Sequence, residues 1–334
     1  MAHLHYKKLL CKNIYTFKPY FGITVQGRTM QFTYIDLFAG IGGFHQAADA
    51  LGGECVFASE IDSEAKRAYT ENYNMAPRGD ITKIDASEIP DHDVLLAGFP
   101  CQPFSIIGKK LGFYDMRGTL FFEIARILKE KKPGLFVLEN VKQLKTHDKG
   151  NTLKIILEAL EDLEYKVYSG ILNALNFGLP QKRERIIIAG FLNKSVNFSF
   201  PNPKIQGKLE DILEKEDAVD AKYFASEEIV RKRKAKHASV YSPGIWHENK
   251  GGNISSYPYS CALRAGASYN YLLVNGTRRL TPREMLRLQG FPDSFKIVCA
   301  DSQTRKQAGN AVPVAVIKAV LQDALHADAR TAGQ

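Results

Sequence analysis

The stretch DLFAGIGG, residues 36–43, decides the fold, because it joins a mostly apolar run at 34–38 to a segment of helical character. Glycines at such a strand-to-helix turn let the backbone approach a ligand closely, and the first N–H groups of the helix are free to bind it. His45 stands where the dinucleotide pattern G-x-G-x-x-G has its third glycine, which disfavours a nicotinamide oxidoreductase. The stretch therefore predicts a strand, a ligand-binding turn and a helix.

Downstream, short apolar runs alternate with amphipathic segments. The runs lie at 55–58, 94–97, 135–138 and 186–189, and apolar residues recur at helical spacing in 120–129 and 152–163. Strands that alternate with helices are typical of a doubly wound α/β sheet. The runs around 165–174 and 185–191 are separated by the turn-rich sequence NFGLPQKR, so we expect them to form a hairpin at a sheet edge.

Two carboxylates stand in register with the glycine turn. Glu60 lies about 20 residues beyond the glycines at the end of the next strand, where it could accept hydrogen bonds from ribose hydroxyls. Asp80, at a third strand–loop junction, could accept one from an adenine amino group. The alternative is a tight turn with two solvated acids. The combination favours a nucleoside cofactor.

A second group of reactive side chains follows other strand ends. Cys101 lies in the motif GFPCQPFS at 98–105, just past an apolar strand, and the two prolines stiffen this loop. A lone cysteine is more often an inert buried residue, but this setting favours a nucleophile. Glu139 ends the next strand, where it could also be a helix cap. The charge run QKRER is either a solvated turn or, if the hairpin forms, places Arg183 and Arg185 within reach of Cys101.

Composition sets wider limits. The 334 residues suffice for one large domain, or a large and a small one, and the net charge of +9 is compatible with a polyanionic partner. The five cysteines are scattered without ligand spacing, which argues against a disulfide framework or a zinc site and fits a reducing cytoplasm. No apolar run reaches the ~18 residues of a membrane span, and the N-terminus lacks the pattern of a signal peptide.

Changes in composition and hydrophobic periodicity suggest domain boundaries. Between about 192 and 275, prolines and glycines interrupt the periodicity and a basic run, RKRKAK, occupies 231–236. This run could follow phosphates or form a solvated helix face. We predict an N-terminal appendage at 1–29, a large α/β domain with the catalytic and cofactor-binding residues at 30–191, a second, loop-rich domain at 192–277, a return to the large domain at 278–327 and a tail at 328–334.

Six motifs, in order, resemble the bacterial C5-cytosine DNA methyltransferases of the HhaI restriction–modification type. They are DLFAGIGG, GFPCQPFS, ENV, QKRER, RRLTPREMLRLQGFPDSF and GNAVPVAV. The resemblance covers residues 32 to 323 and is weakest at 192–274. It implies an S-adenosylmethionine-dependent methyltransferase sheet, a small loop-rich target-recognition domain, and a cleft for double-stranded DNA.

The resemblance also implies catalytic roles. Cys101 attacks cytosine C6, and Glu139 holds the ring N3 and amino group from an enclosed site that favours a protonated carboxyl. Arg185, supported by Arg183, binds the cytosine O2 and stabilises the Cys101 thiolate. The reaction needs no metal. The implied contacts of S-adenosylmethionine, whose product is S-adenosylhomocysteine, are Phe38, Gly40, Gly42, Glu60, Asp80, Pro100, Leu120 and Asn310.

A cytosine inside a duplex is inaccessible and must be flipped out. The segment 104–119 resembles the mobile loop that closes over the flipped base in this family. In it we expect Ile107 to act as an apolar wedge, and Lys109, Lys110 and Arg117 to contact phosphates. Ala262-Leu263 stands where many relatives have Thr-Leu, which puts one backbone contact in doubt.

The expected protein is a cytoplasmic monomer that protects host DNA beside a restriction endonuclease that is not a stable subunit. A tRNA cytosine methyltransferase is an alternative, although its eukaryotic branch usually has Pro-Pro-Cys where this chain has Phe99-Pro100-Cys101. A catalytically inactive DNA-binding regulator is another, opposed by the joint presence of Cys101, Glu139 and Arg185.

Overall fold

The computed structural model describes residues 23–25, 28–100 and 120–332. Its contacts divide the described residues into two compact units. The first, here called the sheet unit, contains the described residues up to Leu172 together with Glu184–Pro201 and the chain from Val316 onward. The second unit contains Asn173–Arg183 and Asn202–Ala315.

The sheet unit is built on six strands in the order β4-β3-β5-β6-β9-β7. They are β3 (Phe32–Leu37), β4 (Gly53–Ser59), β5 (Val94–Gly98), β6 (Leu135–Val141), β7 (Lys166–Asn173) and β9 (Glu184–Phe191). The first four are parallel and β9 runs antiparallel to β6. The predicted doubly wound α/β sheet is therefore confirmed, and β7 and β9 are neighbours at one edge, as the hairpin interpretation expected.

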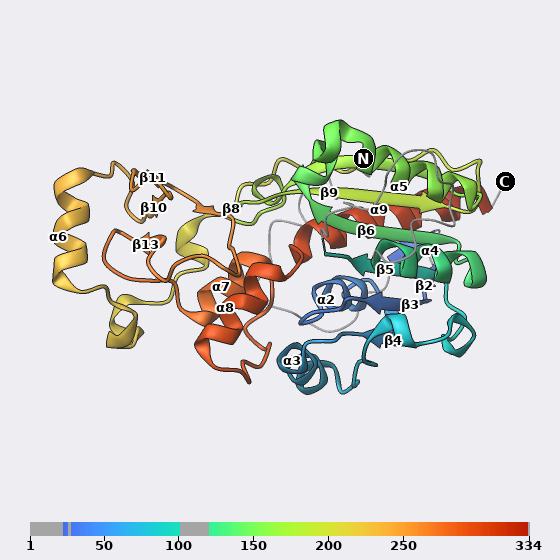
Figure 1. Cartoon of the computed structure of the whole chain (residues 1–334), viewed down its shortest axis with the longest axis horizontal. Coiled ribbons are helices and arrows are strands. Elements are labelled where there is room, and N and C mark those ends of the chain that lie inside the picture. Colours follow the sequence, from blue (N-terminus) through green and yellow to red (C-terminus); the bar gives the residue numbers. More distant parts are fainter. Residues whose placement is uncertain (1–22, 26–27, 101–119, 333–334) are drawn as a thin grey trace. The chain divides into compact units, whose positions relative to one another are not determined.

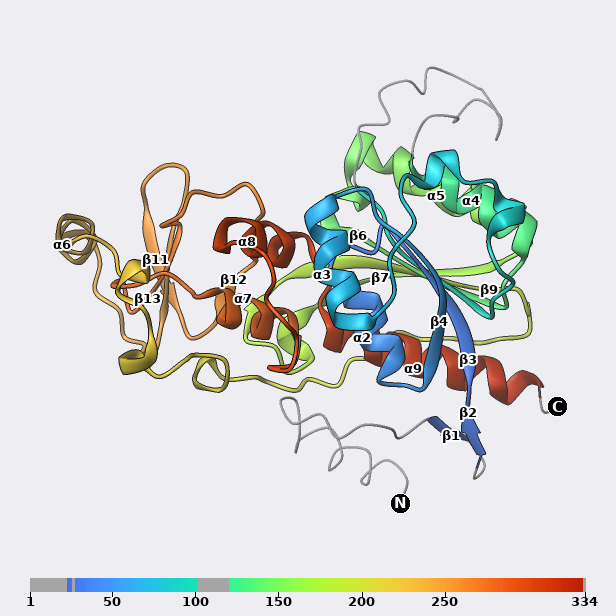
Figure 2. The ribbon, with the colours of Figure 1, turned by 90° about the horizontal axis from the view of Figure 1, so that it is seen from below.

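Helices cover both faces of this sheet. Figure 2 shows α4 and α5 on one face and α2 and α9 on the other. The helices of the sheet unit are α2 (Gly43–Asp49), α3 (Ser63–Tyr73), α4 (Leu120–Lys131), α5 (Asn151–Asp162) and α9 (Val314–Ala332), of which α9 joins the unit at Val316. The amphipathic segments 120–129 and 152–163 thus form α4 and α5. A short hairpin of β1 (Ile23–Val25) and β2 (Arg28–Met30) precedes β3.

The core lies between α4, α5 and the middle strands. Strands β5 and β6 bury their residues on both faces, and Phe136 and Leu138 of β6 are fully buried against Ile124 and Leu128 of α4. A fully buried side chain of this size contributes about 1.5–3 kcal/mol. This core fixes the carboxyl ends of β5 and β6, which carry the second group of predicted site residues.

The described residues of the second unit form a small antiparallel sheet in the order β11-β10-β13, together with helices (Figure 1). Its strands are β8 (Gln181–Lys182), β10 (Ile245–Glu248), β11 (Ile254–Tyr257), β12 (Ser260–Cys261) and β13 (Leu272–Val274), and its helices are α6 (Glu227–Lys236), α7 (Pro282–Gln289) and α8 (Asp301–Asn310). Strand β8 pairs with β12.

The boundaries of the compact units differ from those of the predicted domains. Residues 278–315, expected to return to the catalytic domain, cluster with 202–277, and the chain rejoins the sheet unit only within α9. The segment 173–183 also belongs to the second unit. Polar networks that tie these segments together explain the difference. Which segments recognise the target stays a prediction.

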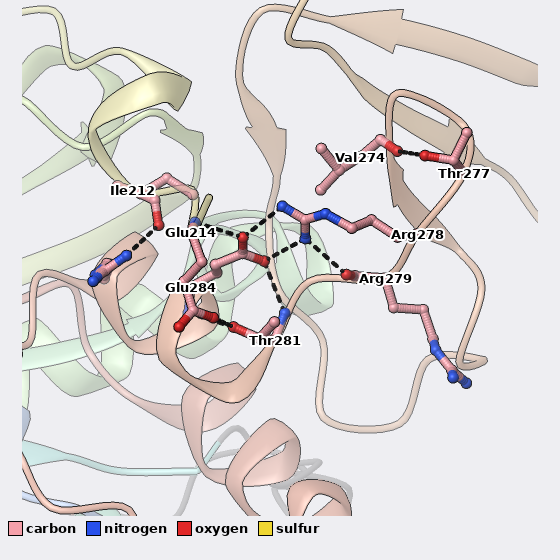
Figure 3. A network of polar contacts seen from close by, with 9 residues as sticks. Ile212, Glu214, Val274, Thr277, Arg278, Arg279, Thr281 and Glu284 are labelled. Atoms are coloured by element: carbon pink, nitrogen blue, oxygen red, sulfur yellow. Dashed lines mark hydrogen bonds and ion pairs between the residues drawn. The ribbon is translucent and has the colours of Figure 1, made fainter. Parts of the chain in front are cut away.

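One such network centres on the buried carboxylate of Glu284 (Figure 3). The Arg278 guanidinium donates to both of its oxygens, at 2.9 and 2.8 Å, and the backbone N–H groups of Thr281 and Glu214 donate to them at 2.8 and 2.9 Å. The Arg278 and Glu284 side chains are 3% and 0% exposed. Because Thr281 also caps α7, this network holds α7 to the segment around Glu214.

Within the described ranges, no helix combines the length and apolar character needed to cross a bilayer. No group of three metal-binding side chains is found there either.

Candidate active site

Three residues of the turn between β3 and α2 have left-handed backbone conformations. Phe38, Gly40 and Gly42 have φ of 56°, 56° and 80°. A Cβ added to Gly40 would meet no atom within 4 Å, so open space lies beside this backbone. A Cβ on Gly42 would approach the Tyr73 ring to 2.2 Å. Gly40 therefore faces room for a ligand, whereas Gly42 is required by the packing of Tyr73.

Glu60 lies just beyond β4 and is half-buried. One of its oxygens accepts a hydrogen bond from the Gly40 N–H at 2.7 Å and the other accepts from the Asp62 N–H at 2.8 Å. The carboxylate thus links the glycine turn to the residue that caps α3. The structure brings Glu60 and Gly40 together, as the nucleoside interpretation requires.

Asp80 caps a short 3₁₀ turn at Ile81–Lys83. Its carboxylate accepts hydrogen bonds from the Thr82 hydroxyl at 2.8 Å and from the Thr82 N–H at 3.1 Å. These two bonds lower the pKa of Asp80, so the side chain is an ionised acceptor at neutral pH.

Ile61 was missed by the sequence analysis. It directly follows Glu60 and its side chain is 73% exposed, which is unusual for a large aliphatic residue. An apolar residue immediately after the acidic residue at a strand end is the signal that could have identified it. Its position makes it a candidate for packing against a cofactor ring.

The carboxyl ends of β5, β6 and the start of β9 bring two predicted catalytic residues together. Gly98 pairs with Glu139, and Val141 pairs with Arg185. Arg185 Nε lies 2.8 Å from Glu139 Oε1, and the two side chains are 14% and 9% exposed. The chain continues from Gly98 to Cys101 within three residues. Cys101 itself lies outside the described residues.

Asn140 is a second residue that the sequence analysis did not single out. It is 2% exposed, and its Nδ2 donates to the Phe99 carbonyl at 2.9 Å. Its Oδ1 accepts from the Val141 N–H at 2.8 Å. Asn140 therefore ties the end of β6 to the backbone two residues before Cys101. Its place directly after Glu139 was the available signal.

Residues 32–326 match the family model described as C-5 cytosine-specific DNA methylase. The chain belongs to this family. It is a DNA (cytosine-5-)-methyltransferase, its substrate is DNA, and the family implies S-adenosylmethionine as the methyl donor.

Curated relatives match this methyltransferase over most of their length. It is 58% identical over 294 residues to the type II methyltransferase M.HaeII of Haemophilus aegyptius, which covers 87% of this chain and 92% of the relative. It is 40% identical over 302 residues to the type II methyltransferase M.HhaI of Haemophilus parahaemolyticus, covering 85% and 91%. The crystal structure of the S. pombe Dnmt2 methyltransferase superposes with a TM-score of 0.68 at 22% identity over 88% and 98% of the two chains, which shows the shared fold.

Arg183 of the methyltransferase has a different setting from Arg185. Its side chain is 1% exposed and donates to three backbone carbonyls, those of Leu263 at 3.1 Å, Gly309 at 3.1 Å and Ala311 at 2.7 Å. It belongs to the second unit, whereas Arg185 belongs to the sheet unit. These contacts indicate that Arg183 stabilises the backbone around Gly309–Ala311. Its support of catalysis stays a prediction.

The remaining predicted residues of the methyltransferase are spread over both units. Pro100 is exposed, Leu120 is half-buried at the start of α4, and Asn310 is exposed at the end of α8 in the second unit. The expected DNA contacts Ile107, Lys109, Lys110 and Arg117 lie outside the described residues.

Proposed function

We propose that this chain is a type II modification methyltransferase that methylates C5 of a flipped-out cytosine in a short specific duplex site. The observation that carries the catalytic assignment is the Glu139–Arg185 pair, held at 2.8 Å beside the start of the cysteine loop. The names of the relatives support the type II class. Such an enzyme protects host DNA in a restriction–modification system.

The residues around the glycine turn fit S-adenosylmethionine. Open space at Gly40 leaves room for the cofactor against the backbone, and Glu60 offers carboxylate oxygens for the ribose hydroxyls. Ile61 offers an apolar surface for the adenine, and Asp80 an acceptor for its amino group. When bound, the cofactor supplies an electrophilic methyl group on a sulfonium sulfur.

The protein makes cytosine C5 nucleophilic. The Cys101 thiolate bonds to C6, the electron pair of the C5–C6 double bond forms a double bond between C4 and C5, and the C4–N3 π pair moves onto N3. Glu139 delivers a proton at N3, and Arg185 holds O2 and stabilises negative charge as it develops. After C5 has been methylated, the C5 proton passes to solvent water, the C5–C6 double bond re-forms, the sulfur leaves as the Cys101 thiolate, and N3 returns its proton to Glu139.

A trapping experiment tests this function. Bisulfite sequencing of DNA from cells that express the chain identifies the methylated site. A duplex with 5-fluorocytosine at that site should then become covalently attached in the presence of S-adenosylmethionine, because the C5 fluorine cannot leave as a proton would. Absence of an adduct, or an adduct that persists in Cys101→Ser, would overturn the proposal. Methylation of tRNA in place of duplex DNA would favour the alternative enzyme.

The family relationship to bacterial type II enzymes also supports the remaining proposals. The methyltransferase acts as a monomer in the cytoplasm, needs no metal, and shares its recognition site with an endonuclease that is a separate protein.

A further inference from the structure

The second unit contains a cavity of about 590 Å³ whose lining is strongly basic. Four cations line it: Lys222, Arg264, Arg279 and Arg305. Asp301 is the carboxylate among the lining residues, and it is already engaged by Lys222 Nζ at 2.9 Å and by the Tyr223 hydroxyl at 2.7 Å. The three arginines therefore leave a net positive charge in the cavity.

These arginines are held by aromatic rings and carbonyl groups. The Arg305 guanidinium lies 4.3 Å from the centre of the Tyr269 ring, which Arg279 also approaches, at 5.8 Å. Arg264 lies 4.8 Å from the Tyr271 ring. Within the described part of the chain, none of the three forms an ion pair. Aromatic faces orient a guanidinium without neutralising its charge.

Their hydrogen-bonding capacity is also incomplete. Arg305 donates to the Ala267 carbonyl and Arg279 to the Lys222 carbonyl. Arg279 Nε and Arg305 Nη1 are nevertheless buried without an acceptor among the residues that the structure describes. Buried donors of this kind are costly to leave unmatched. Because both arginines also line the cavity, a ligand with several anionic oxygens that enters it would supply the countercharge that they lack.

The shape of the cavity suggests what accompanies these oxygens. Leu263, Leu280 and Met285 contribute apolar lining, and the Tyr269 ring is 54% exposed beside Arg305. A phosphodiester with its deoxyribose presents anionic oxygens and an apolar ring together, whereas a free phosphate presents only the former. Arginine is also the side chain that best matches phosphate oxygens.

We propose that this cavity binds a backbone phosphate of the substrate DNA through Arg279 and Arg305, with the adjoining deoxyribose against Tyr269. The inference rests on the proposed function, because it takes duplex DNA as the ligand. It assigns phosphate binding to residues dispersed over the sequence, in addition to the predicted phosphate contacts of the 104–119 segment.

The basic run at 231–236 provides a contrast. On α6, Lys232 pairs with Glu228 at 2.6 Å, and Arg233 is buried and paired with Glu248 at 2.5 Å. These two cations of the run are paired with the unit's own carboxylates, so they are not expected to bind phosphate. Lys232→Gln is therefore a suitable control.

The test is the salt dependence of DNA binding. The logarithm of the DNA-binding constant falls linearly with the logarithm of the salt concentration. Each phosphate contact that is lost makes this fall less steep, by about 0.9 in the slope, and weakens binding about eightfold at 0.1 M salt. We expect this change for the double variant Arg279→Gln with Arg305→Gln, and a part of it for each single glutamine variant, on a poly(dA-dT) duplex and on the methylated site alike. Arg305→Lys should keep the slope, because it keeps the charge, and Lys232→Gln should leave it unchanged.

The outcomes separate this inference from the proposed function. Unchanged slopes for both glutamine variants would overturn it, as would losses confined to the methylated site, which would indicate base reading. Thermal stabilisation by inorganic phosphate that Arg305→Gln abolishes, with an unchanged DNA slope, would assign the cavity to a small anion. Failure of the 5-fluorocytosine adduct with normal slope changes would leave DNA binding here intact and overturn the proposed chemistry.

Discussion

Glu139–Arg185 in the sheet unit and Arg278–Glu284 in the second unit join the same two residue types in different ways. Arg278 meets both oxygens of Glu284, two backbone N–H groups meet them as well, and the side chains are almost inaccessible. Arg185 approaches Glu139 through Nε at one oxygen, and both side chains keep about a tenth of their surface exposed. The Glu284 carboxylate is completely enclosed, whereas Glu139 lies at the carboxyl end of β6 and keeps 9% of its side chain exposed.

The adjacent residues Arg278 and Arg279 repeat this contrast within two positions of the chain. The side chain of Arg278 reaches into the Glu284 network, while that of Arg279 extends away from it (Figure 3). We infer that complete burial of a charged pair marks a structural role, and that a charged group which keeps part of its surface exposed marks a role in binding or catalysis. The following predictions test this rule.

The largest effect is expected at Glu139. Glu139→Gln keeps the size of the side chain but removes its proton-carrying ability, so methyl transfer in single-turnover assays should fall by about 10²–10⁴. The urea-unfolding midpoint should hardly move. Glu184→Gln, which changes the nearby carboxylate paired with Lys142 at 3.0 Å, should keep full activity. If Glu139→Gln remained active, the catalytic half of the comparison would be wrong.

Arg278→Met should show the opposite pattern, a large loss of stability. It leaves the Glu284 charge buried without its guanidinium, which destabilises the folded state by about 3–5 kcal/mol. Denaturant titration of the full chain measures this, and the neighbouring Arg279→Met should stay within about 0.5 kcal/mol of the parent. Equal losses for the two variants would contradict the distinction between enclosed and open arginines. The double change Arg278→Met with Glu284→Gln should recover part of the stability, because glutamine removes the buried charge and keeps an acceptor for the N–H groups of Thr281 and Glu214.

Asn140 should show an intermediate effect on rate. Asn140→Ala frees the Phe99 carbonyl, and a displacement of about 1 Å at the cysteine loop can lower a rate about 100-fold. The 5-fluorocytosine adduct should then form more slowly but reach the same final yield, because Cys101 and Glu139 are still present. Asn151→Ala, at an exposed position on α5, serves as the control. A lower yield with an unchanged rate would argue against a positioning role.

The strands of the large sheet follow from features that are local in the sequence. Apolar runs such as 94–97 predict β5, and the cysteine motif directly after it predicts a site at that sheet edge. The composition of the second unit is set by contacts that are remote in the sequence. Glu284 meets the backbone of Glu214 from 70 residues away, and Arg183 meets the carbonyl of Gly309 from 126 residues away. Backbone N–H and carbonyl groups are nearly the same in every residue, so no pattern in the sequence indicates such contacts.

The smallest effect concerns the cysteines. Burial, aided by the nearby Asp36 carboxylate, raises the pKa of Cys55 to about 12, so its thiol should resist iodoacetamide at pH 8 in the folded protein. An unfolded thiol ionises near pH 8.5. The folded state therefore holds this proton longer, and its contribution to stability should be lost as the pH rises from about 8.5 to about 12.

Mass spectrometry should find Cys101 alkylated before Cys55, and the reverse order would contradict the assignment of the nucleophile.

The contacts of Arg183 have a consequence for how new sequence specificities could arise. This side chain holds Leu263, Gly309 and Ala311 through their carbonyl oxygens, which every amino acid possesses. A recombinant chimera that exchanges residues 202–315 with a relative of the same backbone path would therefore keep these bonds, whatever side chains it imported. Two crossovers, one at each end of this segment, could therefore replace its surface without rebuilding the three hydrogen bonds that Arg183 provides.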